Sequence, residues 1–534
     1  MKLVTKSNFP PYNEADYIIF KDGDYVYAKN GKSGRIEYQS SDIEDVLEYT
    51  ANALEGNVDG ENGGIIAITK GSYKFTRQVT IGGGIILKFN NAMIDLTEIN
   101  SYAFYFDASG MSNDAAKPTG IIGPLLVVGD TSNPNAGFVH LHNVIYGITL
   151  KDIHEAGVAN SLRLTGKGYL GYIEHCDFGL AGDNYGGSSG TKIYIEGGTP
   201  DNTYNKNGLT FINTAIQGKN LDSLIYIKDP GENIVFDNVW IETSGTNMET
   251  IYIENASVRI SNAYIYVGTA KVKNSTLKIT NTKLHTTFDD VYSSDIFITN
   301  SMILSKLLNI TNPTEATESI FINGNYFSVP NDRILYSEYD LGTVIITNNK
   351  ISASNGIKMI KGADASGYTR TVIISNNQFT GGSLSGENYL DLETVYVVIT
   401  GNTFKSTTLS SSDNIIKVSN AITTMITNNS FATNVSPFPP NISVNSLYKI
   451  LKNNVGYTTE NSSTATFSGD GSTTQFTIAH KLVSTPSKVL VTPMSSDAAG
   501  DFYVTADDTN IYVNYKTAPP SGTNNIKLSW YAEV

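Results

Sequence analysis

The 534-residue chain contains one cysteine, Cys176, so it can form no disulfide bond within itself. It is also poor in charge, because Lys and Arg number 37, Asp and Glu number 51, and all four together make up 16% of the residues. The net charge of −14 lacks the basic excess that binding to a nucleic-acid backbone requires. No apolar run is long enough to span a bilayer. We therefore expect neither a nucleic-acid partner nor a membrane span, and we expect Cys176 to be a small buried core thiol.

Uncharged polar residues and tyrosine are abundant instead. The chain has 47 Gly and 32 Tyr, and it is rich in Asn, Ser and Thr. Tyrosine offers a flat amphipathic ring, and hydroxyl and amide groups offer hydrogen bonds. Such a surface suits a carbohydrate better than a polyanion.

One hexapeptide, apolar-x-Asn/Gly-x-x-apolar, recurs down most of the chain. Clear copies begin at Phe211, Phe236, Ile260, Ile279, Ile298, Ile322, Ile346, Ile374, Ile399 and Ile426. Weaker copies begin at Leu150, Ile173 and Leu451. A period in the twenties with one short apolar strand per repeat is typical of a solenoid. The alternative is an array of β-sandwiches with coincidental spacing.

The residue types favour strands over helices in this solenoid. The repeats show β-branched and aromatic residues without a 3.6-residue period. In a parallel β-helix the leading Ile or Phe would point inward and stack on its equivalent one coil away. The Asn would suit a bend, since it tolerates left-handed backbone, and stacked Asn side chains can form a hydrogen-bonded ladder. The predicted fold is all-β, a parallel β-helix; the resemblance described below implies that it is right-handed.

Three regions are predicted along the chain. Residues 1–40 have the alternation and turns of a small β-meander. Residues 41–462 would be a capping helix followed by the β-helix, with a capping box at Ser41-Asp42-Ile43-Glu44. The apolar face of that helix would be Ile43, Val46, Leu47, Ala51 and Leu54. Residues 463–534 alternate between turns, which predicts a compact antiparallel β-sandwich domain.

Two segments carry a resemblance to known proteins. The helix over residues 42–54, followed by GGIIAITKGSY, resembles the start of pectate-lyase-like (pectin-lyase-like) right-handed β-helix proteins. The C-terminal segment from GDGSTTQFTIAH to NIKLSWYAEV is similar to the small β domains that end viral tail fibres and spikes, including those of archaeal viruses. The resemblance implies a tail spike or receptor-binding protein, and such proteins are typically homotrimers.

The expected partners and location follow from this resemblance. The chain begins with Met and has no apolar signal-peptide core near its start. A virion protein is made in the host cytoplasm and is carried outside cells with the particle, so it would need no signal peptide. Residues 1–40 would dock to the virion tail, baseplate or an adaptor, whereas the rod and the C-terminal domain would recognise a host cell-surface glycan or glycoprotein. The C-terminal domain would also hold the three copies together. Exposed aromatic residues such as Trp240, Tyr264 and Tyr266 would mark contacts between copies.

The spacing between Ile173 and Phe211 is longer than one repeat, which predicts a loop suited to binding or catalysis. Glycosidases need two carboxylates, about 5 Å apart for retention or roughly 6.5–9.5 Å for inversion. The catalytic candidates are Asp183, Glu196, Asp201, Asp237 and Glu242. The carbohydrate-binding candidates are Tyr185, Tyr194, Tyr204 and Trp240.

Known catalytic motifs do not strengthen the interpretation as an enzyme. Polygalacturonase-like enzymes carry an Asp-Asp element, found here at Asp289-Asp290, but the Gly-His-Gly and Arg-Ile-Lys elements are missing. His140 and His142 alternate on a predicted strand and so face one side, either as a pair of metal ligands or as polar surface residues. We expect no cofactor and no metal. A non-enzymatic adhesin is therefore favoured. The alternatives are a spike depolymerase, either a glycoside hydrolase or a polysaccharide lyase, and a secreted cellular polysaccharide lyase.

Overall fold

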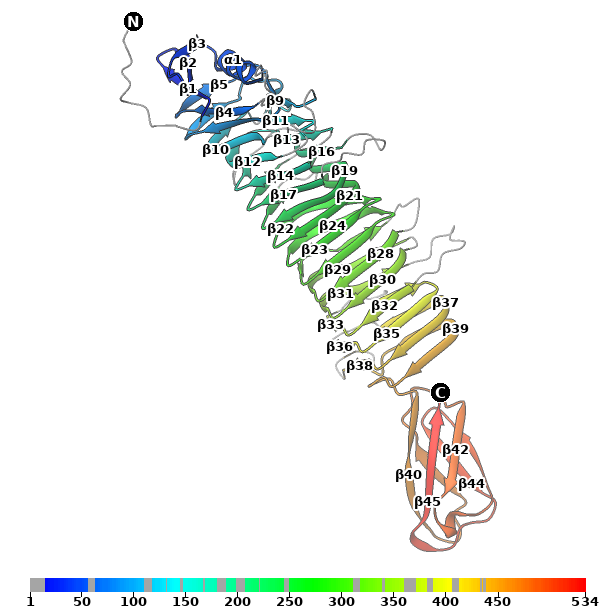
Figure 1. Cartoon of the computed structure of the whole chain (residues 1–534). Helices are drawn as coiled ribbons and strands as arrows, with labels where there is room; N and C mark the ends of the chain where they lie inside the picture. The colour runs from blue at the N-terminus through cyan, green and yellow to red at the C-terminus, as the bar shows by residue number, and fades with distance from the viewer. Residues whose placement is uncertain are drawn as a thin grey trace. The chain divides into compact units, whose positions relative to one another are not determined.

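The computed structural model describes residues 15–55, 63–109, 118–130, 132–144, 147–166, 169–179, 189–197, 207–219, 221–243, 249–310, 317–338, 341–359, 371–381, 388–405, 413–432, 435 and 438–534. The chain divides into two compact units, Met1–Ser319 and Ile320–Val534. Nearly all elements are strands, and in both units the strands of successive coils pair in parallel (Figure 1). Every coil visits three faces in the same order, named A, B and C below.

Face A of the first unit carries the repeated hexapeptide. It consists of β4 (Gly64–Ile68), β7 (Ile85–Phe89), the first halves of β10 (Thr119–Val128) and β12 (Ile148–Ala156), β14 (Tyr169–Glu174), β17 (Asn207–Ile212), the second halves of β19 (Ser223–Asp237) and β21 (Glu249–Ser261), β23 (Thr276–Thr280) and β25 (Asp295–Thr299).

Faces B and C of the first unit complete each coil. Face B consists of β5 (Gly71–Lys74), β8 (Ala92–Asp95), the second halves of β10 and β12, β15 (Asp177–Phe178), β18 (Ala215–Gly218), β20 (Trp240–Thr243), the first halves of β22 (Tyr264–Lys273) and β24 (Lys283–Tyr292), and β26 (Met302–Ile303). Face C consists of β6 (Val79–Gly82), β9 (Tyr102–Asp107), β11 (Gly137–His142), β13 (Asn160–Thr165), β16 (Thr191–Glu196), the first halves of β19 and β21, the second halves of β22 and β24, and β27 (Leu308–Ile310).

The second unit continues the same pattern. Face A has β28 (Thr317–Asn323), β30 (Leu341–Thr347), β32 (Thr371–Ser375), β35 (Tyr396–Thr400) and the second halves of β37 (Ile416–Thr427) and β39 (Ile442–Lys452). Face B has the first halves of β29 (Tyr326–Ser337) and β31 (Lys350–Met359), with β33 (Gln378–Thr380), β36 (Thr403–Lys405) and β38 (Ser430–Phe431). Face C has the second halves of β29 and β31, β34 (Leu390–Glu393) and the first halves of β37 and β39. The prediction of a right-handed parallel β-helix is confirmed.

The hexapeptide places its residues as predicted. The leading residues stack inward, and the rings of Phe211 and Phe236 lie 4.6 Å apart at 14°. The Asn that follows adopts the left-handed backbone that forms the bend between faces A and B, with φ of 52° at Asn262 and 54° at Asn376. Asn tolerates this conformation because its short amide side chain bonds locally.

A second Asn, directly after the bend, forms a buried ladder in the second unit. It occupies Asn325, Asn349, Asn377, Asn402, Asn429 and Asn454. The backbone N–H and the Nδ2 of each of the first five Asn donate to Oδ1 of the Asn in the next coil, for example from Asn377 to Asn402 at 2.9 and 3.0 Å. Cys176 occupies the corresponding position in an early coil, where it is buried as predicted and where burial strongly raises its pKa.

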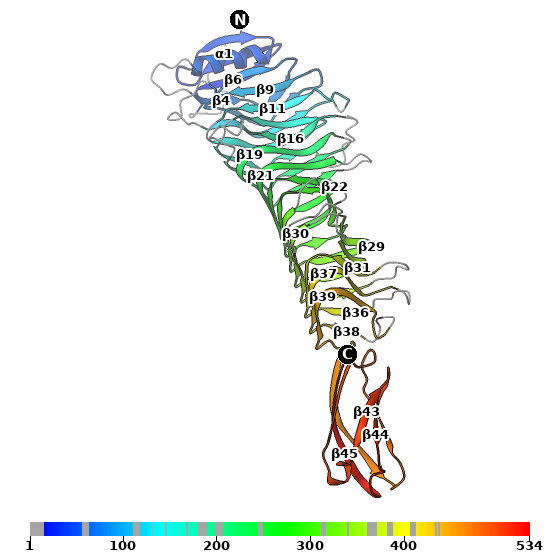
Figure 2. The ribbon, with the colours of Figure 1, turned by 90° about the vertical axis from the view of Figure 1, so that its right-hand side faces the viewer.

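Helix α1 (Ile43–Glu55) lies over the first coil beside β4 and β6 (Figure 2). All five residues of its predicted apolar face are buried. The predicted capping box is wrong, because the carboxylate of Glu44 does not turn back toward Ser41. It accepts hydrogen bonds from the backbone N–H of Thr76 at 2.7 Å and of Arg77 at 3.4 Å, which fastens the helix to the coil below.

The N-terminal meander is built onto the first coil. Strands β1 (Tyr17–Asp22), β2 (Tyr25–Asn30) and β3 (Ile36–Ser40) pair antiparallel, and β1 also pairs in parallel with β4. Ile18 and Ile19 of β1 are buried. Removing β1 would therefore uncover the core of the first coil.

A charged cluster lies inside the first unit. Glu155 and Lys192 are both fully buried, and Nζ of Lys192 is 3.9 Å from Oε2 of Glu155. The Ser161 hydroxyl donates to the same carboxylate, and Lys192 donates to the carbonyl of Val158. Burial raises the pKa of Glu155 to about 7, because desolvation outweighs the attraction of Lys192.

The last strands form the predicted antiparallel sandwich. One sheet contains β40 (Glu460–Gly469), β45 (Gly522–Glu533) and β42 (Lys488–Pro493), and the other contains β41 (Gln475–Ala479), β44 (Asn510–Tyr515) and β43 (Phe502–Ala506). The short 3-10 turn η2 (Ser496–Ala498) precedes β43. Ile511, Val513, Ile526 and Leu528 are fully buried between the sheets. The strands of this sandwich begin at Glu460. The division of the chain into three functional regions stays a prediction.

Candidate functional site: an aromatic groove on face C

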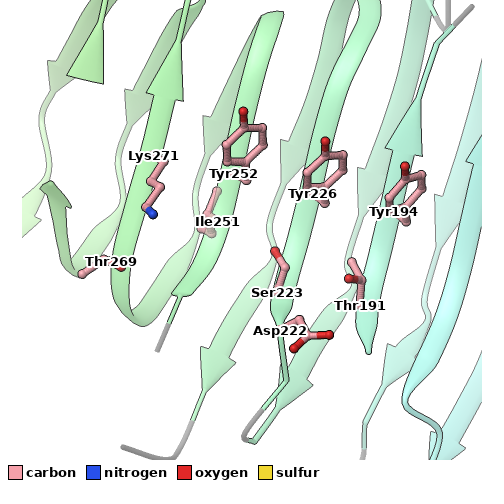
Figure 3. Close-up of a pocket in the computed structure, with 9 residues that line it drawn as sticks. All are labelled: Thr191, Tyr194, Asp222, Ser223, Tyr226, Ile251, Tyr252, Thr269 and Lys271. Carbon is pink, nitrogen blue, oxygen red and sulfur yellow. The ribbon is translucent and has the colours of Figure 1, made fainter. Parts of the chain in front are cut away.

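Three tyrosines of successive coils form a row on the outside of face C. Tyr194 pairs in register with Tyr226, and Tyr226 with Tyr252. Their ring centroids are 4.9 Å apart at both steps, with interplanar angles of 9° and 6°. Figure 3 shows the three side chains side by side along their strands. The row is a ribbed aromatic surface whose repeat equals the strand spacing.

The local sequence explains this placement. The tyrosines lie in IYIE (193–196), IYIK (225–228) and IYIE (251–254). Residues alternate across a strand, so the Ile residues on either side of each Tyr point into the core while the Tyr points out. Sequence reasoning found Tyr194 but missed Tyr226 and Tyr252. The threefold repeat of Ile-Tyr-Ile was the signal that could have found them.

The tyrosines line a groove of about 440 Å³. Its other lining residues are Thr191, Asp222, Ser223, Ile251, Thr269 and Lys271. Thr191 and Ser223 are in register, so hydroxyl groups run beside the aromatic row. The carboxylate of Asp222 accepts the backbone N–H of Gly190 at 3.0 Å. The groove therefore combines flat apolar surfaces with hydrogen-bonding groups.

Glutamates hold two of the phenols. The hydroxyl of Tyr194 donates to Oε2 of Glu196 at 2.6 Å, and the hydroxyl of Tyr252 donates to Glu254. Burial and these hydrogen bonds raise the pKa of both tyrosines. Burial also raises the pKa of Tyr226. All three rings are thus neutral phenols at physiological pH, fixed in orientation along the groove.

Cationic residues follow the tyrosines in the same row. On one side, the guanidinium of Arg163 lies 4.4 Å from the centroid of the Tyr194 ring. On the other side, Lys271 is in register with Tyr252. In the neighbouring row, Lys228 pairs with Glu254 at 3.7 Å. The charges of the groove are mixed in sign.

The same row continues to His140 on β11, and His142 lies in the neighbouring row, in register with Thr165. His140 and His142 face one side, as predicted, and the hydroxyl of Thr165 lies 2.7 Å from Nε2 of His140 and 2.8 Å from Nδ1 of His142. Among the residues that the structure describes, no group of three or more His, Cys, Asp or Glu side chains could hold a metal ion.

The segment between Ile173 and Phe211 is not simply a loop. Residues 191–196 form strand β16, which carries both Tyr194 and Glu196 on face C, because alternating KIYIE suits a strand with a buried face. Asp183, Tyr185, Asp201 and Tyr204 lie outside the described residues. Of the candidates in this segment, the structure therefore brings together Tyr194 and Glu196.

Trp240 and Glu242 form a separate surface on face B. Trp240 is 47% exposed, its Nε1 donates to Oε2 of Glu242 at 2.8 Å, and its ring lies 4.5 Å from that of Tyr264. In the next row Tyr266 stacks on His285 at 4.6 Å. These side chains point outward as expected.

Asp237 lies at the bend between faces A and B. Its carboxylate accepts hydrogen bonds from the Ser261 hydroxyl at 2.7 Å and from Nδ2 of Asn262 at 2.8 Å. The first of these bonds contributes most to lowering its pKa. These contacts give Asp237 a role in holding two coils together.

No protein-family model matches the chain, and the search of characterised proteins gives no match. Among solved structures, the Gp54 tailspike of Acinetobacter baumannii bacteriophage AP22, in complex with A. baumannii capsular saccharide, has a TM-score of 0.43 and 9% identity, covering 92% of this chain and 94% of that chain. The A-module of Azotobacter vinelandii mannuronan C-5 epimerase AlgE6 has a TM-score of 0.40 and 10% identity, covering 78% and 95%. A mutant tailspike of E. coli bacteriophage HK620, in complex with pentasaccharide, has a TM-score of 0.38 and 11% identity, covering 92% of this chain and 90% of that chain. At these identities no residue role is carried over.

The groove's own chemistry suits recognition of a ring-shaped, hydroxyl-rich ligand. Sugar rings present C–H faces that pack on aromatic surfaces, and their hydroxyls bond to groups such as Thr191, Ser223 and Asp222.

The described part of the chain has no helix long and apolar enough to cross a membrane.

Proposed function

We propose that this protein is a viral tail spike or fibre that attaches to the host cell surface by binding a glycan in the face C groove. The observation that carries the proposal is the row of Tyr194, Tyr226 and Tyr252, repeating every 4.9 Å. A polysaccharide is also a periodic ligand made of rings and hydroxyls. An extended row can contact several of its sugars at once.

The binding test targets the central tyrosine. Purified full-length protein is titrated with a panel of microbial surface polysaccharides by isothermal titration calorimetry, and the best ligand is used for the variants. Tyr226→Ala removes the ring that stacks on both neighbours and should weaken binding at least tenfold, which corresponds to about 1.4 kcal/mol. Tyr172→Ala is the matched control, since Tyr172 is 59% exposed on face A of the same unit. Equal affinities for all three proteins, or no binding to any polysaccharide, would refute the proposal.

The rival function is depolymerisation of the same glycan. The register places Glu196 and Glu254 two coils apart, which is about 10 Å and close to the spacing of inverting glycosidases. However, Lys228 lies between them and pairs with Glu254 at 3.7 Å, and both carboxylates accept tyrosine hydroxyls. We favour the adhesin for this reason. Shortened polysaccharide chains after incubation, absent with Glu196→Gln, would establish the rival.

The proposal includes a homotrimer and attachment of the N-terminal end to the virion. Three parallel copies would present three grooves, and multivalent contact raises avidity. Because β1 is part of the first coil, a deletion that tests virion docking should stop at residue 14. Such a deletion should leave glycan binding unchanged and reduce incorporation into particles. Unchanged incorporation into particles would contradict the proposed role of residues 1–14 in docking to the virion.

A further inference from the structure

An uncharged apolar strip runs along face A of the second unit. On parallel strands of successive coils, Ile345, Ile373, Val398, Met425 and Ile450 are in register. They point outward, since the residues on either side of them along each strand up to β37 belong to the core. All five are partly exposed, and Ile450 is 44% exposed. An outward row of five aliphatic residues is not required by the core of the β-helix.

The rows on both sides of the strip are also nearly free of charge. One consists of Thr343, Thr371, Tyr396, Thr423 and Tyr448, and the other of Thr347, Ser375, Thr400, Thr427 and Lys452. Of these fifteen positions only Lys452 is charged. In the first unit the same outward row of face A carries Arg259 and Lys278. The strip is therefore a local property of the second unit.

On one side of the strip, hydroxyls of adjacent coils are bonded to one another. The Ser375 hydroxyl donates to Oγ1 of Thr347 at 3.0 Å, and those of Thr400 and Thr427 lie 3.1 Å apart. The strip has aliphatic side chains at its centre and offers no stacked rings. The two tyrosines beside the strip, Tyr396 and Tyr448, are two coils apart with Thr423 between them, so they form no continuous aromatic row like that of the groove on face C.

We infer that this strip is the surface along which copies of this chain pack side by side. The inference rests on the proposed homotrimer and names the contact surface within it. A partner must be equally long, apolar and repetitive, and a parallel copy related by an axis along the strip meets these conditions coil for coil. The lack of charge matters as well, because two chains of net charge −14 can approach most readily through a neutral face. Burial of aliphatic side chains then supplies the attraction.

Exposed apolar residues near the end of the strip support the same occupant. Leu447 and Tyr448 in β39 are 73% and 64% exposed, and Tyr448 lies in the row beside Ile450. Large apolar residues gathered in this way usually mark an interface. They follow the strip at its C-terminal end, so contact between copies would extend to the last coil.

The first test measures mass in solution. The full-length chain should have about three times 57.8 kDa, or about 173 kDa, by light scattering at micromolar concentration. The variant Ile373→Lys/Val398→Lys should fall to the mass of one chain. Gln378→Lys is the matched control, because Gln378 lies outward on face B a few residues after Ile373 and should keep the trimer. A double variant that stays trimeric, or a control that dissociates, would overturn the inference.

The second test does not depend on dissociation. The native Cys176 is buried, so Ile373→Cys introduces an accessible thiol. A short bis-maleimide should link Ile373→Cys chains into covalent dimers on a denaturing gel and leave Gln378→Cys chains unlinked. Failure of Ile373→Cys to link in a trimeric protein would overturn the assigned surface while the trimer stands. A monomeric wild type would refute both the trimer and the strip, whereas glycan binding through Tyr226 would be judged separately.

Discussion

Removing one side chain from the buried Asn ladder should destabilise the second unit far more than its size suggests. Oδ1 of Asn402 accepts hydrogen bonds from the backbone N–H of Asn377 at 2.9 Å and from its Nδ2 at 3.0 Å. Nδ2 of Asn402 in turn donates to Oδ1 of Asn429 at 3.0 Å and to the carbonyl of Ile374 at 2.8 Å. Asn402→Ala therefore leaves two buried donors of Asn377 without this acceptor.

Each buried polar group left unsatisfied costs about 1–3 kcal/mol, so the two donors left by Asn402→Ala should cost about 2–6 kcal/mol. Asn402→Ser should cost roughly half as much. The first unit shows why, because a serine at the equivalent position, Ser301, accepts the backbone N–H of Thr282 at 3.1 Å. A serine can thus replace the backbone half of the pairing but not the side-chain half.

The assay is urea-induced unfolding followed by circular dichroism, with Gln378→Ala as a surface control close to the ladder. We expect the order of stability to be wild type and Gln378→Ala, then Asn402→Ser, then Asn402→Ala. The reasoning is refuted if Asn402→Ala is as stable as Asn402→Ser, or if it lies within about 1 kcal/mol of the control, since that would mean the ladder bonds contribute little beyond side-chain volume.

Two further predictions concern the first unit. The pKa of Glu155 is about 7 in the folded protein against an ordinary 4.5, so the folded state holds this proton more tightly and the free energy of unfolding should fall as pH rises from about 4.5 to 7. Glu155→Gln should remove this fall when unfolding midpoints at pH 5 and pH 8 are compared, and an unchanged pH dependence would contradict the assignment. At Asn281, where φ is 50°, Asn281→Gly should be nearly neutral, whereas Asn281→Val should cost about 1–2 kcal/mol in thermal unfolding; equal effects would exclude backbone strain as the cause.

The core of this fold was predictable because the sequence repeats its physical requirements. An inward Ile or Phe and a left-handed Asn or Gly recur in the clear hexapeptides, and both are local properties of the chain. Asn262 and Asn376 therefore occupy the predicted bend, and Phe211 and Phe236 stack as predicted.

The groove was less predictable because it depends on register between coils of unequal length. Tyr194, Tyr226 and Tyr252 are separated by 32 and 26 residues, and only the pairing of β16, β19 and β21 brings them into one row. The capping box failed for a related reason. Glu44 satisfies the local pattern, but its buried carboxylate bonds instead to the backbone of Thr76, a partner that a sequence pattern cannot reveal.

Because side chains alternate across a strand, the residues that form the core and those that form the surface occupy separate positions in this chain. Inward residues keep the coils stacked, whereas each outward row can change without disturbing them. Several outward rows nevertheless keep one residue type over successive coils: tyrosine at Tyr194, Tyr226 and Tyr252, and aliphatic residues from Ile345 to Ile450. Stacking between coils stabilises such a row in part, and a uniform row also offers a contact surface to a partner with the same period. Aromatic rings with hydroxyl neighbours match a chain of sugars, and aliphatic residues with self-paired hydroxyls match another copy of the β-helix, so the two rows point to two different partners.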